Sequence, residues 1–410
     1  MSEYPSPFTL HPSPFILHPS PSTFLRHLTP KNFLSFGLDN AGIELKALNL
    51  LIGPNGSGKS NLIEAISMIR SAPREFRDVT NKGGGVEEWI WKGGPKEPAS
   101  VDCLVSNPKS PTLLRHVLSF RSVAQAFALE DERVENAYPQ TGQPDVYFYY
   151  RYQRGQPVVN TSERGQRRLA RETIEADRSI LAQRRDPETY PELTWLAQNY
   201  ERVRIYREWA FGRNAVFREP QKSDHRNDVL EEDFSNLGLF LNRLKTRFPA
   251  AKKAILDGLK DLYDGIHDFD ILVQGGTVQV FFTEGDFVIP ATRLSDGTLR
   301  YLYLLAILCD PEPPPLICLE EPELGLHPDI LPKVADLLRA ASERTQLIVT
   351  THSDILVDAM TETPEAVVVC SKQQGQTTME RLNLDDLSEW LKKYRLGQLW
   401  TKGEIGGTRW

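Results

Sequence analysis

Eight consecutive residues read Gly-Pro-Asn-Gly-Ser-Gly-Lys-Ser, from Gly53 to Ser60. A loop that wraps a triphosphate needs backbone angles that larger residues avoid, and it needs its N–H groups close to the phosphate oxygens; glycine meets both needs. In such a loop Lys59 reaches the outer phosphates and Ser60 holds a magnesium ion. The residues predicted to contact the nucleotide are Gly53, Pro54, Asn55, Gly56, Ser57, Gly58, Lys59, Ser60 and Asn61. The pattern predicts a site for ATP and Mg²⁺.

The sequence on either side supplies the elements that would position this loop. The apolar run Leu48–Ile52 precedes it and predicts a buried strand, and residues 61–66 follow it with the apolar spacing of a helix. The alternative is a glycine-rich surface turn followed by a chance Lys-Ser pair. A strand before the loop and a helix after it weigh against that alternative.

A second apolar run, residues 315–319, ends in the carboxylates Glu320 and Glu321. A phosphate loop requires an acidic partner, because magnesium must be held from a second side and the attacking water must be oriented. We predict that Glu320 holds the metal, directly or through water, and that Glu321 orients or activates the water. The alternative is a pair of carboxylates at a helix N-terminus, a position that acids favour electrostatically.

Two histidines follow these runs. His352 comes directly after the apolar run 345–350, and at the tip of a core strand its ring N–H can stabilise the outer phosphate. His327, in Leu-His-Pro, leaves two interpretations open, a catalytic role or a capping and packing role.

A Ser-x-Gly turn precedes the acidic run by some twenty residues and opens a segment with helical spacing. Free N–H groups, a positive dipole end and a hydroxyl together make an anion site. An ordinary helix with a serine N-cap is the alternative. The candidate ligand-contacting residues of this turn are Leu294, Ser295, Asp296 and Gly297.

In this order, the loop, the serine turn, the acidic run and Thr-His-Ser resemble the ATP-binding-cassette ATPase heads, and most closely the RecF-like and SMC-like group. The sequence Glu321–Pro328 is similar to the variant of the acidic motif found in RecF-like and overcoming-lysogenization-defect ATPases. Residues 31–36 look like the opening strand of that group, and Gly403–Gly407 resembles the tail of a RecF-like subgroup. The resemblance implies that Ser295 and Gly297 close on ATP held by a second copy, so that the chain works as a homodimer.

The resemblance also implies the fold class, an α/β P-loop NTPase head of the ABC type, with a mixed sheet, flanking helices and a helical arginine-rich insertion. We predict a proline-rich disordered tail at residues 1–23 and an N-terminal lobe with the phosphate loop at residues 24–150. A helical subdomain follows at residues 151–265, and a C-terminal lobe with the remaining motifs at residues 266–410.

The arginines between residues 151 and 213 allow two interpretations. This segment holds thirteen arginines, no lysine and nine acidic residues, a local net charge of +4 in a chain of net charge -7. A solvated helical face with ion pairs is one interpretation, and a basic surface for a phosphate backbone is the other. Residues 164–185 and 193–209 have a helix-like sequence, so we predict helices there under either interpretation of the arginines.

The composition is that of a globular protein, with 40% apolar and 25% charged residues in a chain of 410 residues. The four cysteines are widely spaced and form no metal-binding pattern, which favours a reducing compartment. No apolar run approaches the roughly 18 residues of a membrane span, and no secretion signal is visible. We therefore expect a cytoplasmic protein without a membrane partner.

The sequence departs from the family pattern in three ways. Glu320 stands where the family usually has aspartate, the family's glutamine-bearing loop is not located, and long coiled-coil arms are missing. The leading hypothesis is an ATPase whose head dimerisation acts in DNA repair or recombination. The alternative is a nucleotide-gated regulatory subunit of an anti-phage defence system that controls a nuclease or another effector. A transporter subunit, the third class, does not suit a chain with a large insertion and no membrane span.

Overall fold

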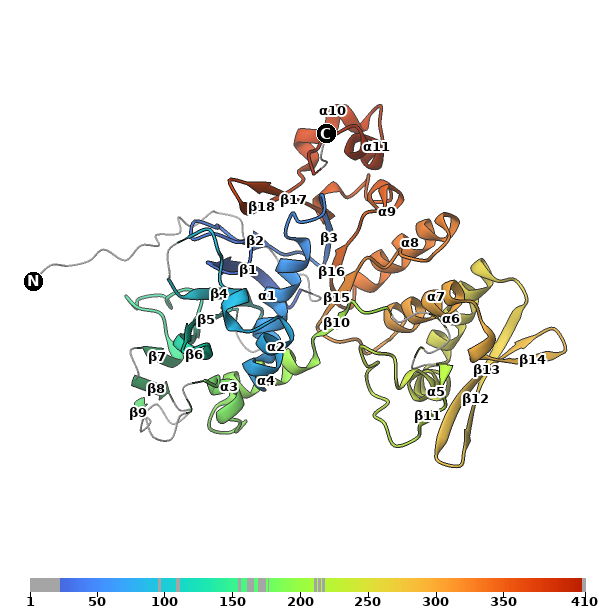
Figure 1. Cartoon of the computed structure of the whole chain (residues 1–410), viewed down its shortest axis with the longest axis horizontal. Helices are drawn as coiled ribbons and strands as arrows, with labels where there is room; N and C mark the ends of the chain where they lie inside the picture. Colours follow the sequence, from blue (N-terminus) through green and yellow to red (C-terminus); the bar gives the residue numbers. More distant parts are fainter. Residues whose placement is uncertain are drawn as a thin grey trace, which may run out of the picture.

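A computed structural model gives the structure of the chain (Figure 1). It describes residues 23–94, 97–107, 111–153, 156–160, 166–168, 175, 177–209, 212, 215 and 218–407, with the backbone alone for residues 153 and 166–168. Apart from Thr23, the predicted proline-rich tail lies outside the described residues.

A six-stranded, mainly parallel sheet carries the phosphate loop, in the strand order β10-β15-β16-β3-β17-β18. Its strands are β3 (Leu48–Ile52), β10 (Arg204–Tyr206), β15 (Leu316–Glu320), β16 (Gln346–Thr350), β17 (Val367–Gln373) and β18 (Gln376–Arg381). All five residues of β3 and of β16 are buried, which explains their uninterrupted apolar sequence, because both faces of the sheet are covered. β15, β16 and β3 are parallel neighbours, so their carboxyl ends meet at one edge.

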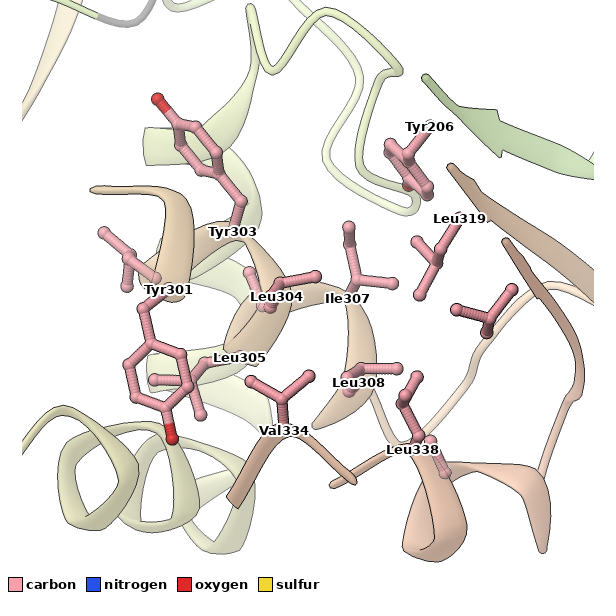
Figure 2. Packing of buried hydrophobic residues seen from close by; sticks show 14 of the residues in the cluster. Tyr206, Tyr301, Tyr303, Leu304, Leu305, Ile307, Leu308, Leu319, Val334 and Leu338 are labelled. Atoms are coloured by element: carbon pink, nitrogen blue, oxygen red, sulfur yellow. The ribbon is translucent and has the colours of Figure 1, made fainter. Parts of the chain in front are cut away.

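The two faces of this sheet pack against different layers. On β3, Leu50 faces a cluster with α7 and α8, whereas Leu51 faces a cluster with α1. Figure 2 shows the first cluster, with Ile307 of α7 directed toward Leu319 of β15. The helices next to the sheet are α1 (Lys59–Ser71), α7 (Asp296–Leu308), α8 (Leu331–Ser342), α9 (Asp354–Asp358), α10 (Leu384–Leu391) and α11 (Leu396–Thr401). This packing fixes the start of α1 and of α7, where the loop and the serine turn lie.

An eight-stranded antiparallel sheet forms the second layer, in the order β2-β1-β4-β5-β6-β7-β8-β9. Its strands are β1 (Leu25–Lys31), β2 (Ile43–Glu44), β4 (Ala99–Val105), β5 (Leu114–Val123), β6 (Ala126–Asn136), β7 (Phe148–Gln153), β8 (Gln156–Asn160) and β9 (Gln166–Arg168). Burial alternates along β4, as expected for a sheet with one face on the core. That face shares its core with α1, so the two sheets enclose this helix.

Smaller elements complete both layers. They are α2 (Phe76–Lys82), α3 (Ile180–Gln183), α4 (Pro191–Arg202) and the 3-10 helices η1 (Val86–Trp89), η5 (Pro328–Ile330) and η6 (Pro364–Ala366). None of the helices in the described part of the chain combines the length and the hydrophobicity needed to cross a membrane.

A third sheet lies beyond α7, at the yellow and orange end of Figure 1. It contains β11 (Gln221–Lys222), β12 (Ile266–Gln274), β13 (Thr277–Glu284) and β14 (Phe287–Pro290), and it packs against α5 (Leu237–Arg247) and α6 (Pro249–Leu262). From β14 the chain passes through η4 (Ala291–Arg293) into α7. The third sheet therefore leads directly into the serine turn.

Most predicted elements are confirmed, and two helical predictions are wrong in part. The described part of residues 164–185 contains strand β9 and only four residues of helix, in α3. The helix predicted at residues 193–209 ends at Arg202, and β10 follows it. β9 pairs with the preceding strand β8, and β10 pairs with the distant strand β15, so strand pairing overrides the local helical pattern in both places.

Candidate nucleotide-binding site

The phosphate loop, the acidic pair and His352 lie at the same edge of the parallel sheet. The loop follows β3, the acidic pair ends β15, and His352 follows β16. Thr350 of β16 is in register with both Glu320 of β15 and Leu51 of β3. The strand order therefore places β16 between the loop and the carboxylates, and it brings together three of the predicted motifs.

Three glycines of the loop adopt backbone angles that favour glycine. Gly53, Gly56 and Gly58 have φ values of 145°, 80° and 100°. A Cβ on Gly53 would collide with the carbonyl oxygen of Cys370, and one on Gly58 would collide with Thr377. A Cβ on Gly56 would meet no atom within 4 Å. The outer two glycines are therefore required for packing against β17 and β18, while the middle one faces open space.

Lys59 is folded against its own loop. Its Nζ donates to the carbonyl oxygens of Gly53 at 2.7 Å and Pro54 at 3.3 Å. Burial lowers the pKa of Lys59, and the charges of Glu321 and Glu323 act in the opposite direction. The ammonium group is thus held over the loop at the place where outer phosphates would lie.

The backbone of Glu321 is left-handed, with φ at 47°, which is unusual for a residue other than glycine. Contacts on both sides hold it there. Its N–H donates to the carbonyl oxygen of Thr350 at 3.0 Å, and its own carbonyl accepts from Nη2 of Arg300 at 2.8 Å. The Glu321 side chain lies with its Oε1 3.6 Å from Nε2 of His352. The predicted catalytic pair is therefore brought together.

His352 is fixed from its backbone side. Its N–H donates to Oε1 of Glu323 at 2.7 Å, and the Thr351 hydroxyl donates to the same oxygen at 2.7 Å. Burial and the charge of Lys59 lower the pKa of His352, against the opposite effect of Glu321. Its ring is therefore neutral at pH 7 and able to donate one hydrogen bond.

Arg300 lies beside the acidic pair, and the sequence did not reveal this position. It is fully buried, and its guanidinium lies 4.5 Å from the ring centroid of Trp209. Burial lowers the pKa of Arg300 to about 10, so it stays charged at neutral pH. Trp209 in turn donates from Nε1 to the carbonyl oxygen of Glu320 at 2.7 Å. The signal in the sequence was a single charge inside the apolar stretch of α7.

Glu320 also has a cationic neighbour, Arg207, which follows β10. The Nε of Arg207 lies 3.7 Å from Oε1 of Glu320, and its Nη1 forms an ion pair with Glu64 of α1. Burial raises the pKa of Glu320, and the charge of Arg207 opposes this rise. No motif in the sequence indicates that this arginine lies beside the acidic pair.

The serine turn lies at the exposed start of α7. Ser295 caps the helix, with its Oγ accepting from the N–H of Thr298 at 3.1 Å. Asp296 forms an ion pair with Arg218 at 2.7 Å, and a Cβ on Gly297 would lie 3.2 Å from the Gly325 carbonyl oxygen. Leu294 is buried. Ser295 is bonded within its own turn, and no hydrogen bond or ion pair among the described residues joins this turn to the phosphate loop.

His327 is an N-cap, since its ring accepts from the N–H of Asp329 at 3.4 Å at the start of η5. Of the two interpretations, this contact supports the capping role.

The residues at the edge fit a magnesium-bound triphosphate. The Ser60 side chain is exposed, and the buried Ser57 Oγ and Glu320 Oε1 have no hydrogen-bond partner among the described residues. Hydroxyl and carboxylate oxygens are hard ligands of the kind that Mg²⁺ prefers. In the described ranges no three His, Cys, Asp or Glu side chains form a metal cluster.

A sequence model of the AAA_21 family, described as "AAA domain, putative AbiEii toxin, Type IV TA system", matches residues 48–358. The chain belongs to this family. AAA_21 membership identifies a P-loop ATPase, a class that generally uses ATP and Mg²⁺. No curated protein matches the sequence significantly.

Solved structures support the same fold for this AAA_21 chain. An SMC head bound to the C-winged helix domain of ScpA has a TM-score of 0.53 at 15% identity and covers 89% of this chain and 99% of its own. The Pyrococcus furiosus Smc head with an extended coiled coil, bound to the C-terminal domain of ScpA, has a TM-score of 0.52 at 14% identity, with 90% and 99% covered. The predicted ABC-type, SMC-like head is thereby confirmed as the fold.

Proposed function

We propose that the chain is an ATP-hydrolysing head that works as a homodimer, in which two copies enclose two ATP molecules and separate after hydrolysis. The observation that carries this proposal is the meeting of the phosphate loop, Glu320–Glu321 and His352 at one edge of the parallel sheet. A site with these groups supplies what phosphoryl transfer needs, namely positioning and charge neutralisation around an oriented water.

Each residue has a separate role in the proposed reaction, in which ATP and water give ADP and phosphate. Lys59 neutralises the outer phosphates, and Ser60 with Glu320 would hold the magnesium ion, which supplies charge neutralisation between the phosphates. Glu321 orients the attacking water and accepts its proton. His352, neutral and 3.6 Å from Glu321, donates a hydrogen bond to the outer phosphate.

The need for a second copy follows from the position of the serine turn. Ser295 is exposed and the first turn of α7 is half-buried, and in the proposed dimer they offer a hydroxyl and the positive end of the helix dipole to an anion outside the chain. In the proposed dimer this turn lies against the ATP of the partner subunit. One chain alone is therefore expected to be a poor catalyst.

The process driven by the cycle is, in our leading hypothesis, DNA repair or recombination in the cytoplasm. The free cysteines, three of them buried, suit a reducing compartment. Among the described arginines of residues 151–213, ion pairs with carboxylates occupy Arg151, Arg178, Arg185 and Arg207. These pairs occupy part of the positive charge of the segment, so DNA contacts would fall to other residues.

The alternative function is a nucleotide-gated subunit that controls a partner nuclease or effector. The family description, which names a putative toxin of a type IV TA system, favours this class. In such a module the ATP state governs docking of the partner, and turnover is slow.

The decisive experiment measures the ATPase rate per chain against protein concentration, with and without single- and double-stranded DNA. A rate per chain that rises with concentration supports the shared site, and a further rise with DNA supports the DNA role. ATP-dependent association without turnover selects the nucleotide-gated module. A constant rate per chain, unaffected by DNA, would contradict both regulated functions.

A further inference from the structure

Strand pairing places Arg207 beside the acidic end of β15. β10 and β15 are parallel, with Tyr206 in register with Leu319. The next residue along each strand is Arg207 and Glu320 respectively. The position of this arginine is thus set by the core of the fold and not by a surface loop.

The guanidinium lies between the two elements that would hold the metal. Its Nη1 is paired with Glu64, and its Nε lies 3.7 Å from Glu320 Oε1. Glu64 follows Ser60 by one helical turn on α1, so both side chains project from the same face of the helix. Arg207 therefore bridges the helix of the metal-binding serine and the strand of the metal-binding carboxylate.

The three charged side chains are partly shielded from water. Their exposed fractions are 30% for Arg207, 25% for Glu64 and 20% for Glu320. Without a cation, two carboxylates would face each other in this partly desolvated place, which is unfavourable. Arg207 removes that repulsion in the nucleotide-free protein.

The guanidinium is hydrogen-bonded to Glu64 through Nη1, whereas its contact with Glu320 is an ion pair without a hydrogen bond. Within the described residues, its Nε and Nη2 are buried and make no hydrogen bond. The Glu320 Oε1 that faces it likewise accepts none there. Contacts of this kind can be exchanged for others at low cost, because few directional bonds have to break.

We propose that Arg207 is a tethered cation that occupies the metal side of Glu320 and competes with the divalent ion that accompanies the nucleotide. The inference rests on the proposed function, since it assumes that Glu320 is a metal ligand. A Mg²⁺ ion binds carboxylate oxygen at about 2.0–2.1 Å and would take the lone pairs that face the guanidinium. Arg207 then withdraws from Glu320 and keeps Glu64. Arg207 thereby raises the metal concentration at which the site fills.

The test is direct titration of the metal into the full chain at saturating ATP, with Mn²⁺ as the probe and electron paramagnetic resonance of free Mn²⁺ as the readout. Mn²⁺ accepts the same oxygen ligands as Mg²⁺. We expect Arg207→Gln and Arg207→Met to lower the half-saturating Mn²⁺ concentration about fivefold, as expected for loss of a partly exposed ion pair. Arg207→Lys, which keeps the charge, should stay near the parent chain.

The matched control is Arg202→Gln, since Arg202 belongs to the same segment but donates to the Pro313 carbonyl oxygen at an exposed position. It should leave the titration unchanged. An unchanged or weaker Mn²⁺ affinity in both neutral variants would overturn the competition, as would an equal shift in Arg207→Lys. If the parent chain binds no ATP, the proposed function fails instead, and a fluorescent ATP analogue reports this separately. Two neutral variants of different shape keep the test valid if one of them does not fold.

Discussion

The sheet edge and the serine turn carry two halves of the candidate site, and they differ in where their partners lie. At the edge, Glu321 contacts His352, and Lys59 bonds the loop it belongs to. At the turn, Ser295 is exposed and bonds Thr298 within its own helix start. The first half is assembled inside one chain, whereas the second presents its donors outward.

In the proposed homodimer, this difference is the reason why a second copy is needed. The two halves are nevertheless joined inside each chain. The helix that begins at Ser295 also carries Arg300, which donates to the carbonyl oxygen of Glu321. A ligand that contacts the turn of one chain would therefore contact a helix that is hydrogen-bonded to Glu321 of the same chain.

Glu321→Gln should disable the half of the site at the sheet edge, and it should lower turnover more than any other substitution. The amide keeps the shape of the side chain but cannot accept a proton, so turnover should fall by about two to four orders of magnitude. ATP affinity should remain, and the closed pair should accumulate. Single-turnover hydrolysis and size-exclusion chromatography with ATP measure the two effects. Glu343→Gln, at the exposed end of α8, is the control, and normal turnover in Glu321→Gln would remove Glu321 from the mechanism.

Ser295→Arg should disable only the half of the site at the serine turn. A large cation in the turn blocks its approach to the partner's nucleotide, so turnover should fall by about two to three orders of magnitude, as for loss of an anion-stabilising donor. Nucleotide affinity of the single chain should stay nearly intact. Equilibrium binding of a fluorescent ATP analogue and steady-state turnover separate the two. Undiminished turnover would refute the shared site.

Mixing two inactive variants tests whether the sheet edge of one chain works with the serine turn of another. Lys59→Ala and Ser295→Arg damage different halves, so a mixed pair contains one site in which both halves are intact. Turnover should return in part when the two variants are combined. Lys59→Ala mixed with Glu321→Gln is the matched control, because both changes affect the edge and every site stays damaged. Equal turnover in the two mixtures would show that the halves are not shared between chains.

Lys59→Ala should weaken ATP binding by about 10–100-fold, because a hydrogen bond between charged groups is lost. Isothermal titration calorimetry with ATP gives the affinity. Lys82→Ala, at the exposed end of α2, controls for the loss of a positive charge. Unchanged affinity would mean that Lys59 keeps its carbonyl contacts when nucleotide binds.

The sequence was sufficient for residues whose role is set by local order. The loop glycines, the acidic pair and His352 follow apolar runs, and a run that ends in polar residues predicts a strand and its tip. Arg207 and Trp209 were missed because pairing between distant segments decides their positions. Tyr206 and Leu319, for example, are in register although more than a hundred residues separate them. No local periodicity carries that information.

Arg300→Met tests the connection between the two halves and should have the smallest effect. Loss of the bond from Arg300 to the Glu321 carbonyl loosens a left-handed backbone that only the bonds to Thr350 and Leu324 would then hold, so we expect turnover to fall about tenfold. ATP affinity should not change. Because a buried charge carries a desolvation cost, an apolar side chain of similar length should leave the melting temperature equal or higher. Turnover that falls while the melting temperature holds would identify Arg300 as a positioning residue, whereas a parallel loss of both would indicate a purely structural one.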